Sequence, residues 1–404
     1  MTRTEQLYEQ VMMRMDMTKQ TGEEELRELI REILEEAGRE EYIPLSEKIR
    51  LSRELFNSFR RLDILQDLIE DETITEIMIN GTANIFYEKE GRIFRSDRRF
   101  LSETRLLDVI QQIVGETNRY VNESSPIADA RLNDGSRVNV VLKPAAVNGP
   151  IVTIRKFPKD AVTMEQLIEM GSITREASEY VKMLVRAKYN IFVSGGTGAG
   201  KTTFLNAMSD FIPKDERIIT IEDNAELQIR GVENLVRLEA RNANLEGEGA
   251  ITIRDLIRSA LRMRPDRIIV GEVRGDETVD MISSAMLNGH SGSMSTGHAN
   301  NPADMLYRLE TMMLMGIDLP LAAIQRQIAS ALDIIIHLGR IRDKSRKVLQ
   351  IEEVLGYQDG GICTRTLFEF REEGVADEKI QGSLMKVGEL ENCRKLVDAG
   401  YKEK

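Results

Sequence analysis

The chain has 404 residues and a mass of 45.8 kDa, a length that suggests two or three domains. Asp and Glu number 67 against 55 Lys and Arg, so the net charge is −12, which argues against binding of nucleic acid through bulk charge. No run of about 18 uncharged apolar residues occurs and the N-terminus lacks an apolar signal-peptide core, so we expect neither a membrane span nor a secretion signal. The two cysteines, Cys363 and Cys393, form no CxxC pair and are interpreted as ordinary reduced thiols.

Residues 1–60 are expected to form a charged helical segment. Apolar residues recur at helical spacing within 22–41, namely Leu26, Leu29, Ile30, Ile33 and Leu34. The other faces of this helix carry carboxylates and arginines. We interpret it as a solvated amphipathic helix that packs on the next domain, and a docking element for a partner is the alternative.

Residues 61–157 predict a compact α+β domain, because strand-like segments surround one amphipathic helix. In chain order the predicted elements are a strand at 74–80, a hairpin at 84–95 that turns at Glu90-Gly91, a helix from Ser102, a second hairpin at 128–144 and a strand at 151–157. Residues 158–173 are predicted to be a linker that contains a short helix.

Residues 174–404 alternate between helix-like and strand-like segments up to about residue 340, which indicates an α/β domain with a mainly parallel sheet. Further strands and a helix are expected toward the C-terminus. Two predicted helices have clear start signals. Thr252 and Asp255 form a capping-box pair, and Asn301 precedes a proline at the first helical position.

The segment 195–202 fits the phosphate-loop pattern G-x-x-x-x-G-K-[ST] in full, between a predicted strand and a predicted helix. Glycines allow successive backbone N–H groups to point at phosphate oxygens, and the helix adds its positive N-terminal end. Lys201 supplies a charge for the β- and γ-phosphates, and the Thr202 hydroxyl can bind Mg²⁺. The predicted nucleotide-binding residues are Gly195, Gly196, Thr197, Gly198, Ala199, Gly200, Lys201, Thr202 and Thr203.

Two other strand ends supply acids. Glu272 follows an apolar strand at its carboxyl end, where ligands of open α/β sheets bind. It is a candidate to polarise an attacking water or to hold Mg²⁺ through a water, and an acid that caps the next helix is the alternative. Glu222, Asp223 and Glu226 form a second group, which needs Mg²⁺, a water to be activated or nearby arginines unless it is a solvated acidic turn.

One histidine and three arginines complete the set of candidates. His298 ends a strand of small residues and is a candidate to contact the γ-phosphate, although a lone histidine is more often structural. Arg131, Arg137 and Arg155 belong to the predicted α+β domain, and phosphoryl transfer gains from an arginine that meets the γ-phosphate. For any single one of them, a surface ion pair is the simpler interpretation.

Four stretches together resemble the type II/type IV secretion ATPase superfamily: GGTGAGKTT, TIEDNAELQI, RMRPDRIIVGEVRG and SMSTGHANNP. In that family they are the Walker A motif, the Asp box, an atypical Walker B motif that ends in glycine-glutamate, and the His box. The resemblance covers roughly residues 60–370. The stretches NANLEGEGAITIRDLIRSALRMRPDRIIVGEVRGDE and SSPIADARLNDGSRVNVVL are similar to the CpaF (TadA-type) branch, which drives tight-adherence pilus assembly.

The resemblance implies a RecA-like P-loop ATPase domain preceded by an α+β N-terminal domain, assembled as a homo-hexamer with ATP and Mg²⁺ between the two domains. It makes Glu272 the Walker B glutamate and His298 the His-box histidine, and it assigns Glu222, Asp223 and Glu226 to the Asp box. It also places Arg131, Arg137 and Arg155 where the family sends arginines to the nucleotide. No structural metal is expected, because the tetracysteine module of the general-secretion branch is absent.

The function that the resemblance implies is hydrolysis of ATP to ADP and phosphate, which powers pilus assembly or secretion through an inner-membrane platform. The chain is then expected in the cytoplasm, at the inner face of that membrane. A ring helicase or nucleic-acid translocase is the alternative, but the net charge of −12 and the lack of tryptophan argue against it, so no nucleic-acid partner is expected. A small-molecule kinase or a regulatory nucleotide-binding subunit agrees less well with the extra domain and with intact Lys201, Thr202 and Glu272.

Overall fold

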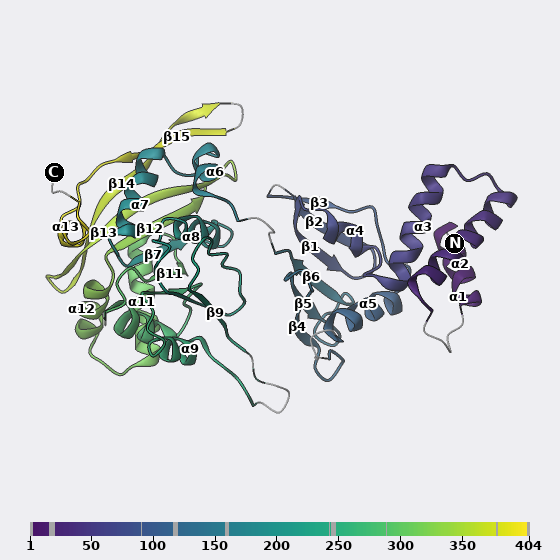
Figure 1. The fold of residues 1–404 in the computed structure, drawn as a ribbon, viewed down its shortest axis with the longest axis horizontal. Coiled ribbons are helices and arrows are strands. Elements are labelled where there is room, and N and C mark those ends of the chain that lie inside the picture. Colours follow the sequence, from purple (N-terminus) through teal and green to yellow (C-terminus); the bar gives the residue numbers. More distant parts are fainter. Residues whose placement is uncertain are drawn as a thin grey trace. The chain divides into compact units, whose positions relative to one another are not determined.

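The structure is a computed structural model that describes residues 3–15, 21–89, 91–115, 120–157, 161–241, 243, 248–287, 289–376 and 379–401. The chain divides into two compact units, 1–159 and 160–404. Figure 1 shows the elements of each unit along the chain. None of the helices within the described ranges combines the length and the apolar character that a bilayer span requires.

The first unit begins with three helices, α1 (Arg3–Arg14), α2 (Glu23–Glu40) and α3 (Leu45–Arg60). They share one hydrophobic core, in which Leu26 and Ile30 of α2 pack with Leu7 of α1 and Leu51 of α3. The predicted helix in this region is therefore confirmed. Its apolar face packs on α1 and α3 rather than on the following domain, because these two neighbouring helices also present apolar faces.

The rest of this unit is a six-stranded antiparallel sheet in the order β3-β2-β1-β6-β5-β4. The helices and strands of this part of the unit are α4 (Leu65–Glu70), β1 (Ile74–Asn80), β2 (Asn84–Lys89), β3 (Arg92–Arg95), α5 (Glu103–Gly115), β4 (Ile127–Arg131), β5 (Arg137–Val141) and β6 (Ile151–Arg155). The two predicted hairpins, the helix and the remaining strands are confirmed. Glu90, predicted at the first turn, lies outside the described residues.

Helices α4 and α5 cover one face of this sheet. Ile77, Ile154, Val138 and Ala130 pair across β1, β6, β5 and β4, so their side chains share a face. All four are buried in one core with apolar residues of α4 and α5. Because side chains alternate along a strand, the neighbouring residues of these strands point to the other face.

The second unit contains a nine-stranded sheet in the order β15-β14-β13-β12-β7-β11-β10-β8-β9. Neighbouring strands pair in parallel in the part β12-β7-β11-β10-β8-β9 and antiparallel in the part β15-β14-β13-β12. The strands are β7 (Ile191–Gly195), β8 (Ile218–Glu222), β9 (Leu235–Glu239), β10 (Arg267–Val270), β11 (Met294–His298), β12 (Ile334–Arg340), β13 (Arg346–Gln358), β14 (Gly361–Ala376) and β15 (Lys379–Lys386). The predicted α/β class with a mainly parallel sheet is confirmed.

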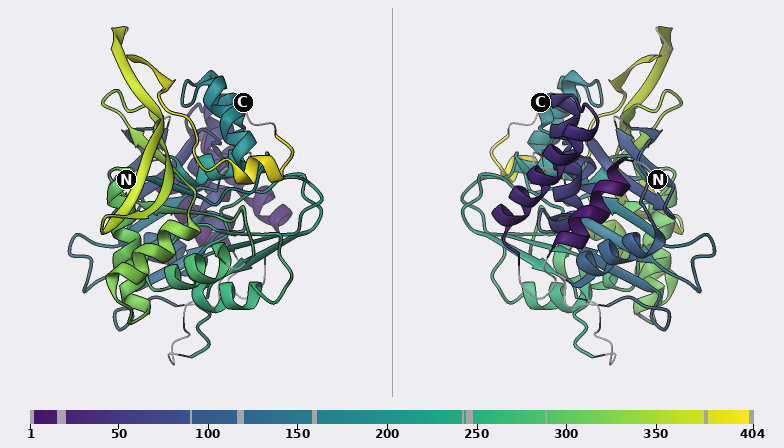
Figure 2. Two further views of the ribbon diagram at one scale, coloured as in Figure 1. Left: turned by 90° about the vertical axis from the view of Figure 1, so that its left-hand side faces the viewer. Right: turned by 90° about the vertical axis from the view of Figure 1, so that its right-hand side faces the viewer.

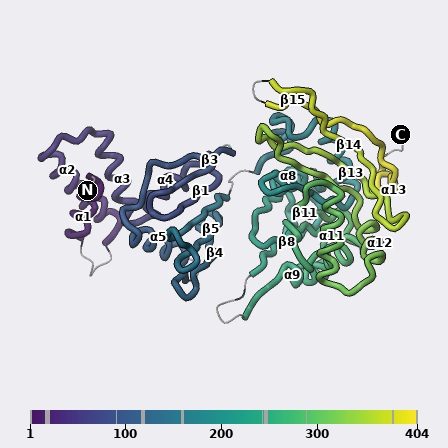
Figure 3. The backbone as a smooth tube through the Cα atoms, turned by 180° about the vertical axis from the view of Figure 1, so that it is seen from behind, coloured from purple at the N-terminus to yellow at the C-terminus, as the bar shows by residue number. Residues whose placement is uncertain are grey.

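Helices cover both faces of the parallel strands. They are α6 (Met164–Glu169), α7 (Arg175–Arg186), α8 (Lys201–Ser209), α9 (Ile253–Ala260), α10 (Glu277–Val279), the π-helix η1 (Asp280–Met286), α11 (Pro302–Gly316), α12 (Leu321–Ala331) and α13 (Arg394–Asp398). In β7, Ile191 and Val193 pack with α7 and α8, whereas Phe192 packs with α9, α11 and α12. Figure 3 traces the backbone of this unit from behind, with β8, β11, α8 and α11 labelled. Burial on both faces leaves the carboxyl ends of the strands as the place where loops can form a site.

The predicted helix starts are confirmed. The Thr252 hydroxyl accepts a hydrogen bond from the Asp255 N–H at 3.1 Å, and the Asp255 carboxylate accepts one from the Thr252 N–H, also at 3.1 Å. The Asn301 side chain accepts a hydrogen bond from the Asp304 N–H at 2.7 Å. The domain boundaries drawn from the sequence stay predictions. Within the predicted linker, residues 158–160 lie outside the described ones, and α6 packs in the core of the second unit.

The C-terminal part of the chain returns to the sheet after a two-stranded arm formed by β14 and β15 (Figure 2). The Glu353 carboxylate, 1% exposed, accepts hydrogen bonds from the N–H groups of Glu391 and Asn392 at 2.8 and 2.7 Å. Lys395 pairs with Asp333 at 2.5 Å. These contacts hold the segment that contains α13 against the starts of β7 and β12, because Asp333 also accepts a hydrogen bond from the Asn190 N–H.

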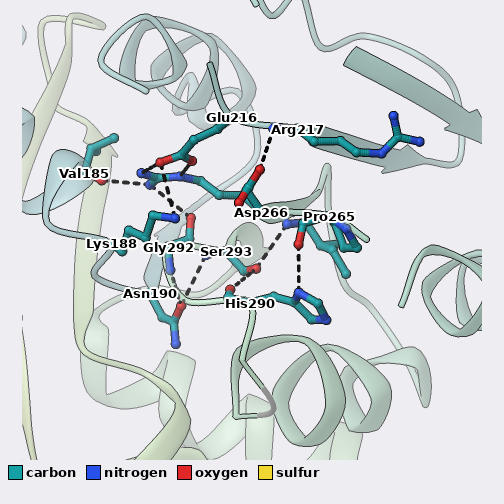
Figure 4. A network of polar contacts seen from close by, with 12 residues as sticks. Val185, Lys188, Asn190, Glu216, Arg217, Pro265, Asp266, His290, Gly292 and Ser293 are labelled. Carbon is teal, nitrogen blue, oxygen red and sulfur yellow. Dashed lines mark hydrogen bonds and ion pairs between the residues drawn. The ribbon is translucent and has the colours of Figure 1, made fainter. Parts of the chain in front are cut away.

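A buried ion pair also lies at the amino end of the parallel strands (Figure 4). Arg267, the first residue of β10, is completely buried, and its guanidinium donates two hydrogen bonds to the Glu216 carboxylate. It also donates to the carbonyl oxygen of Val185 at 2.7 Å. Gly292 leaves the space for it, since a Cβ there would lie 2.6 Å from the guanidinium. The sequence predicted an apolar strand here, and the ion pair was not predicted.

Candidate nucleotide-binding site

The predicted phosphate loop connects the central strand β7 to α8. Strand β7 ends at Gly195, and α8 begins at Lys201 with Gly200 as its N-cap. Gly198 and Gly200 have φ angles of +71° and +91°, in the left-handed region that favours glycine. The glycine positions of the motif therefore follow from the backbone of the loop, and the loop lies at the N-terminus of α8, where an anion is stabilised.

Lys201 is folded into this loop. Its residue is 8% exposed, and its ammonium group donates hydrogen bonds to the carbonyl oxygens of Gly195 and Gly196 at 3.2 Å each. The same Nζ atom lies 3.1 Å from Nδ1 of His298. Since an ammonium group can only donate, Nδ1 is the acceptor, which leaves the neutral imidazole with its proton on Nε2.

His298 joins the loop to Glu272. It is the last residue of β11, opposite Gly195 of β7. Its Nε2 atom, which carries the ring proton, lies 2.9 Å from Oε1 of Glu272. Burial lowers the pKa of His298; Glu272 opposes this effect, and the nearby positive charges of Lys201 and Arg274 add to it.

The other oxygen of Glu272 pairs with Arg274. The Arg274 guanidinium lies 2.7 Å from Oε2 of Glu272 and 3.6 Å from the Asp223 carboxylate. Another acid, Glu277 at the start of α10, accepts hydrogen bonds from the N–H groups of Arg274 and Gly275, which precede the helix. The geometry thus leaves the Glu272 carboxylate facing His298 and Arg274 rather than the start of α10.

The three acids of the second predicted group have different surroundings. Glu222 is 4% exposed, and its Oε1 accepts hydrogen bonds from the N–H groups of Glu226 and Leu227 at 2.9 Å each. Its Oε2 is buried without a hydrogen-bond partner among the described residues. Asp223 is exposed beside Arg274, and Glu226 is half-buried. Burial raises the pKa of Glu222 from 4.5 to about 7, although the two N–H donors act against this rise.

We expect Glu222→Gln to change how stability depends on pH. Between pH 4.5 and 7 the folded chain keeps a proton on Glu222 that the unfolded chain has released, so the free energy of unfolding falls as pH rises. The glutamine variant has no titrating carboxyl group at this position. Over that pH range the free energy of unfolding of the wild type should therefore fall by about 2 to 3 kcal/mol more than that of the variant. Chemical unfolding at pH 5, 6 and 7 without nucleotide measures the difference; parallel curves would contradict the assigned burial.

A cavity of about 470 Å³ opens beside the loop. Its lining comes from the loop, from the end of β11 and from α11, namely Gly196, Thr197, His298, Ala299, Asn300, Asp304, Tyr307 and Arg308. Of the predicted residues, Lys201, His298, Glu272 and Asp223 are joined in one chain of contacts through Arg274, next to this cavity. Thr202 and Thr203 lie in the first turn of α8 and are half-buried.

The three predicted arginines lie in one row of the first unit's sheet. Arg131 is paired with Arg137 across β4 and β5, and Arg137 is paired with Arg155 across β5 and β6. They therefore share the face opposite α4 and α5. Like charges directly opposite each other on neighbouring strands are destabilising. The row continues beyond Arg155 with the carboxylate of Glu76, which is paired with Arg155 across β6 and β1.

Two contacts that support the loop were not predicted. Arg346 of β13 donates a hydrogen bond to the carbonyl oxygen of Gly198 at 2.9 Å, and Ser194 of β7 is 2.9 Å from Nδ1 of His337 in β12. Both contacts join residues more than 140 positions apart in the sequence. No local motif marks such contacts. They follow from the pairing of β7 with β12 and of β12 with β13.

The comparisons identify the family. Residues 60–395 match the family model described as Type II/IV secretion system protein. A Mycobacterium tuberculosis protein named for conjugal transfer is 35% identical over 321 residues, which cover 78% of this chain and 90% of the relative. The type IV secretion system protein VirB11 of Brucella abortus is 33% identical over 304 residues, covering 69% and 84%. The chain therefore belongs to the type II/IV secretion system protein family.

Solved structures agree on the fold. The Legionella pneumophila ATPase DotB has a TM-score of 0.52 and 22% identity, covering 75% of this chain and 81% of that one. The pilus retraction motor PilT, solved with bound ADP, has a TM-score of 0.51 and 22% identity, covering 76% and 81%. The RecA-like ATPase fold and the resemblance to the type II/type IV secretion ATPase superfamily are thereby confirmed.

Proposed function

We propose that this chain is an Mg²⁺-dependent ATPase that works as a homo-hexameric motor for pilus assembly or protein secretion, of the tight-adherence pilus type. The observation that carries the proposal is the contact chain from Lys201 through His298 to Glu272, at the N-terminus of α8. It joins the cation that a phosphate loop needs to an acid that can orient water. Family membership supports the same activity.

Roles follow for the residues of the second unit. Gly195 to Thr203 would hold the phosphates, with the Lys201 ammonium exchanging its carbonyl partners for phosphate oxygens. Glu272 would orient the attacking water, and the neutral His298 would present Nε2–H beside it. Asp223 would act through Arg274, which lies 3.6 Å from its carboxylate. Glu226 would act through its main-chain N–H, which donates a hydrogen bond to the Glu222 carboxylate and holds this segment in place.

The residues fit a hydrated magnesium ion. Glu222 keeps one buried carboxylate oxygen without a hydrogen-bond partner among the described residues, which suits a cation or its water shell. Thr202 would bind the ion directly and Glu272 would bind it through water. When bound, magnesium neutralises charge on the β- and γ-phosphates. No group of three metal-ligating side chains occurs in the described ranges, and such a phosphate-bound ion requires none.

The arginine row supports a second anion contact. Arg131, Arg137 and Arg155 lie side by side in register, and we propose that one of these arginines binds a phosphate group of the nucleotide. The motor would act at the inner face of the cytoplasmic membrane through a platform protein, since relatives are named as secretion system components.

The test is ATP turnover by the purified chain. Lys201→Ala is expected to lower turnover at least about 100-fold, because the loop loses the charge that stabilises the transferred phosphoryl group. Lys182→Ala is the matched control, since Lys182 is on the surface of α7 beside Glu179. Unchanged turnover in Lys201→Ala would overturn the assignment of the site.

Light scattering on the same samples, with and without ATP and Mg²⁺, tests the hexamer. A strictly monomeric protein with full turnover would contradict the ring motor. Single-stranded DNA added to the assay tests the helicase alternative. Stimulated turnover together with salt-dependent DNA binding would favour the translocase instead.

A further inference from the structure

Arg346, the first residue of β13, lies against the phosphate loop. Its Nε atom donates a hydrogen bond to the carbonyl oxygen of Gly198 at 2.9 Å. A Cβ atom at Gly200, the N-cap of α8, would lie 3.4 Å from the Cδ atom of Arg346. The side chain therefore follows the loop from Gly198 to Gly200, toward the end of α8 where an anion is stabilised.

Most of the donors of this guanidinium are unused. An arginine side chain carries five N–H donors, and in Arg346 only the one on Nε has a partner among the described residues. Arg346 is exposed and forms no ion pair within the described ranges. The residue opposite it on β12 is Arg340, a second cation, so the strand pairing supplies no negative charge. The two Nη groups are therefore open to an anionic ligand.

The backbone that carries Arg346 is held in place. The ammonium group of Lys347 donates a hydrogen bond to the carbonyl oxygen of Gly171 at 2.7 Å. The Val348 N–H donates one to the carbonyl oxygen of Ser172 at 2.8 Å. Both acceptors follow α6, which packs in the core of the second unit. A guanidinium on a fixed strand loses less freedom when it binds a ligand than one on an unsupported segment.

Arg346 and the residues proposed for hydrolysis lie on opposite sides of the phosphate loop. The loop leaves β7, and the strand order around it is β13-β12-β7-β11-β10. His298 ends β11 and Glu272 follows β10, whereas Arg346 begins β13. The bond that hydrolysis breaks must lie on the side of Glu272. Arg346 is therefore on the side of the phosphates that ATP and ADP share.

We propose that Arg346 binds these shared phosphates and contacts ATP and ADP equally. The inference rests on the proposed function, because it adds a residue to that nucleotide site. A guanidinium can offer two parallel N–H donors to a phosphate, and the hydrogen bond from Nε to Gly198 orients them. A contact of equal strength in the ground state and the transition state lowers KM without raising kcat. Arg346 thus serves nucleotide affinity, and Glu272 serves hydrolysis.

Arg346→Ala is expected to weaken the binding of ADP and of a non-hydrolysable ATP analogue by the same factor, at least about tenfold. Calorimetry with the full chain and Mg²⁺ measures both. KM for ATP should rise by a similar factor, whereas kcat should stay within about twofold. The melting temperature without nucleotide should fall by no more than about 3 °C, because the residue is exposed. Arg342→Ala is the matched control, since Arg342 is an exposed arginine of the same turn that pairs with Glu372 of β14.

Arg346→Gln separates contact with phosphate from support of the loop. Glutamine keeps an N–H donor for the carbonyl oxygen of Gly198 but has no charge, so its affinity for ADP should fall nearly as far as in the alanine variant. Wild-type affinity in Arg346→Gln would restrict Arg346 to loop support and overturn the proposal.

Two further results would overturn the role of Arg346: unchanged ADP affinity in Arg346→Ala, or a loss of kcat with KM unchanged, which would place Arg346 in the hydrolytic step. Lys201→Ala distinguishes this failure from that of the proposed function. If Lys201→Ala loses turnover while Arg346→Ala behaves as the wild type, only the role of Arg346 fails. If the wild type neither binds ADP nor hydrolyses ATP, the proposed function fails and the role of Arg346 with it.

Discussion

Glu272→Gln is expected to lower ATP turnover by about 10³-fold or more while ADP binding stays within a few-fold of the wild type. The glutamine keeps the shape of the side chain but cannot accept a proton from water. The carboxylate lies 2.9 Å from Nε2 of His298 and 2.7 Å from the Arg274 guanidinium. His298 in turn contacts Lys201, so the acid is aligned with the phosphate loop rather than with bulk solvent.

Single-turnover hydrolysis and calorimetric ADP binding measure the two effects separately. Glu233→Gln, which changes an exposed acid of the same unit, is the matched control and should leave both unchanged. Loss of ADP binding in Glu272→Gln in parallel with loss of turnover would assign Glu272 to nucleotide affinity. Full ATP turnover by the Glu272→Gln variant would show that Glu272 takes no part in hydrolysis.

Arg267→Met is expected to destabilise the second unit by about 3 to 5 kcal/mol. The arginine is completely buried, and its removal leaves the Glu216 carboxylate, 7% exposed, without its two strongest donors. Lys188, 3.5 Å from Glu216, compensates only in part because its side chain is half-exposed. The methionine also leaves the carbonyl oxygen of Val185 without this donor.

The midpoint of chemical unfolding of the full chain measures this loss. Arg394→Met removes an exposed arginine 3.9 Å from Asp398 and should change stability by less than about 0.5 kcal/mol. Arg267→Met/Glu216→Leu should recover much of the loss, because a buried apolar pair needs no compensating charge. A single variant as stable as the wild type would contradict the buried pair.

Local patterns predicted most of the elements and the core of the site. The phosphate loop, the capping pair at Thr252 and the cap at Asn301 each depend on residues within a few positions, so the sequence contains the whole signal. The strand that delivers Glu272 was predicted for the same reason, as an apolar run that ends in an acid.

Contacts between distant segments could not be predicted in this way. Arg267 and Glu216 are 51 positions apart, and only the parallel pairing of β10 with β8 brings them together. The turn between β4 and β5 is short, so the sequence itself suggests that Arg131 lies opposite Arg137. Arg155 comes opposite Arg137 only through the pairing of β5 with β6, which no local pattern predicts. In the sequence Gly271 is only one residue of a motif, whereas the structure shows that the side chain of Glu222, 49 positions earlier, packs against it.

The position of β7 in the sheet has a consequence for synthesis of the chain. Strand β7 lies between β11 and β12, and its contacts to β12 join residues 143 positions apart. A ribosome therefore releases the apolar sequence Ile191–Gly195 long before either neighbour exists. During that interval the strand is an open edge, the kind of surface that pairs with other chains. Chains truncated before residue 334 would keep that edge permanently, so we expect them to aggregate rather than to form smaller ATPases.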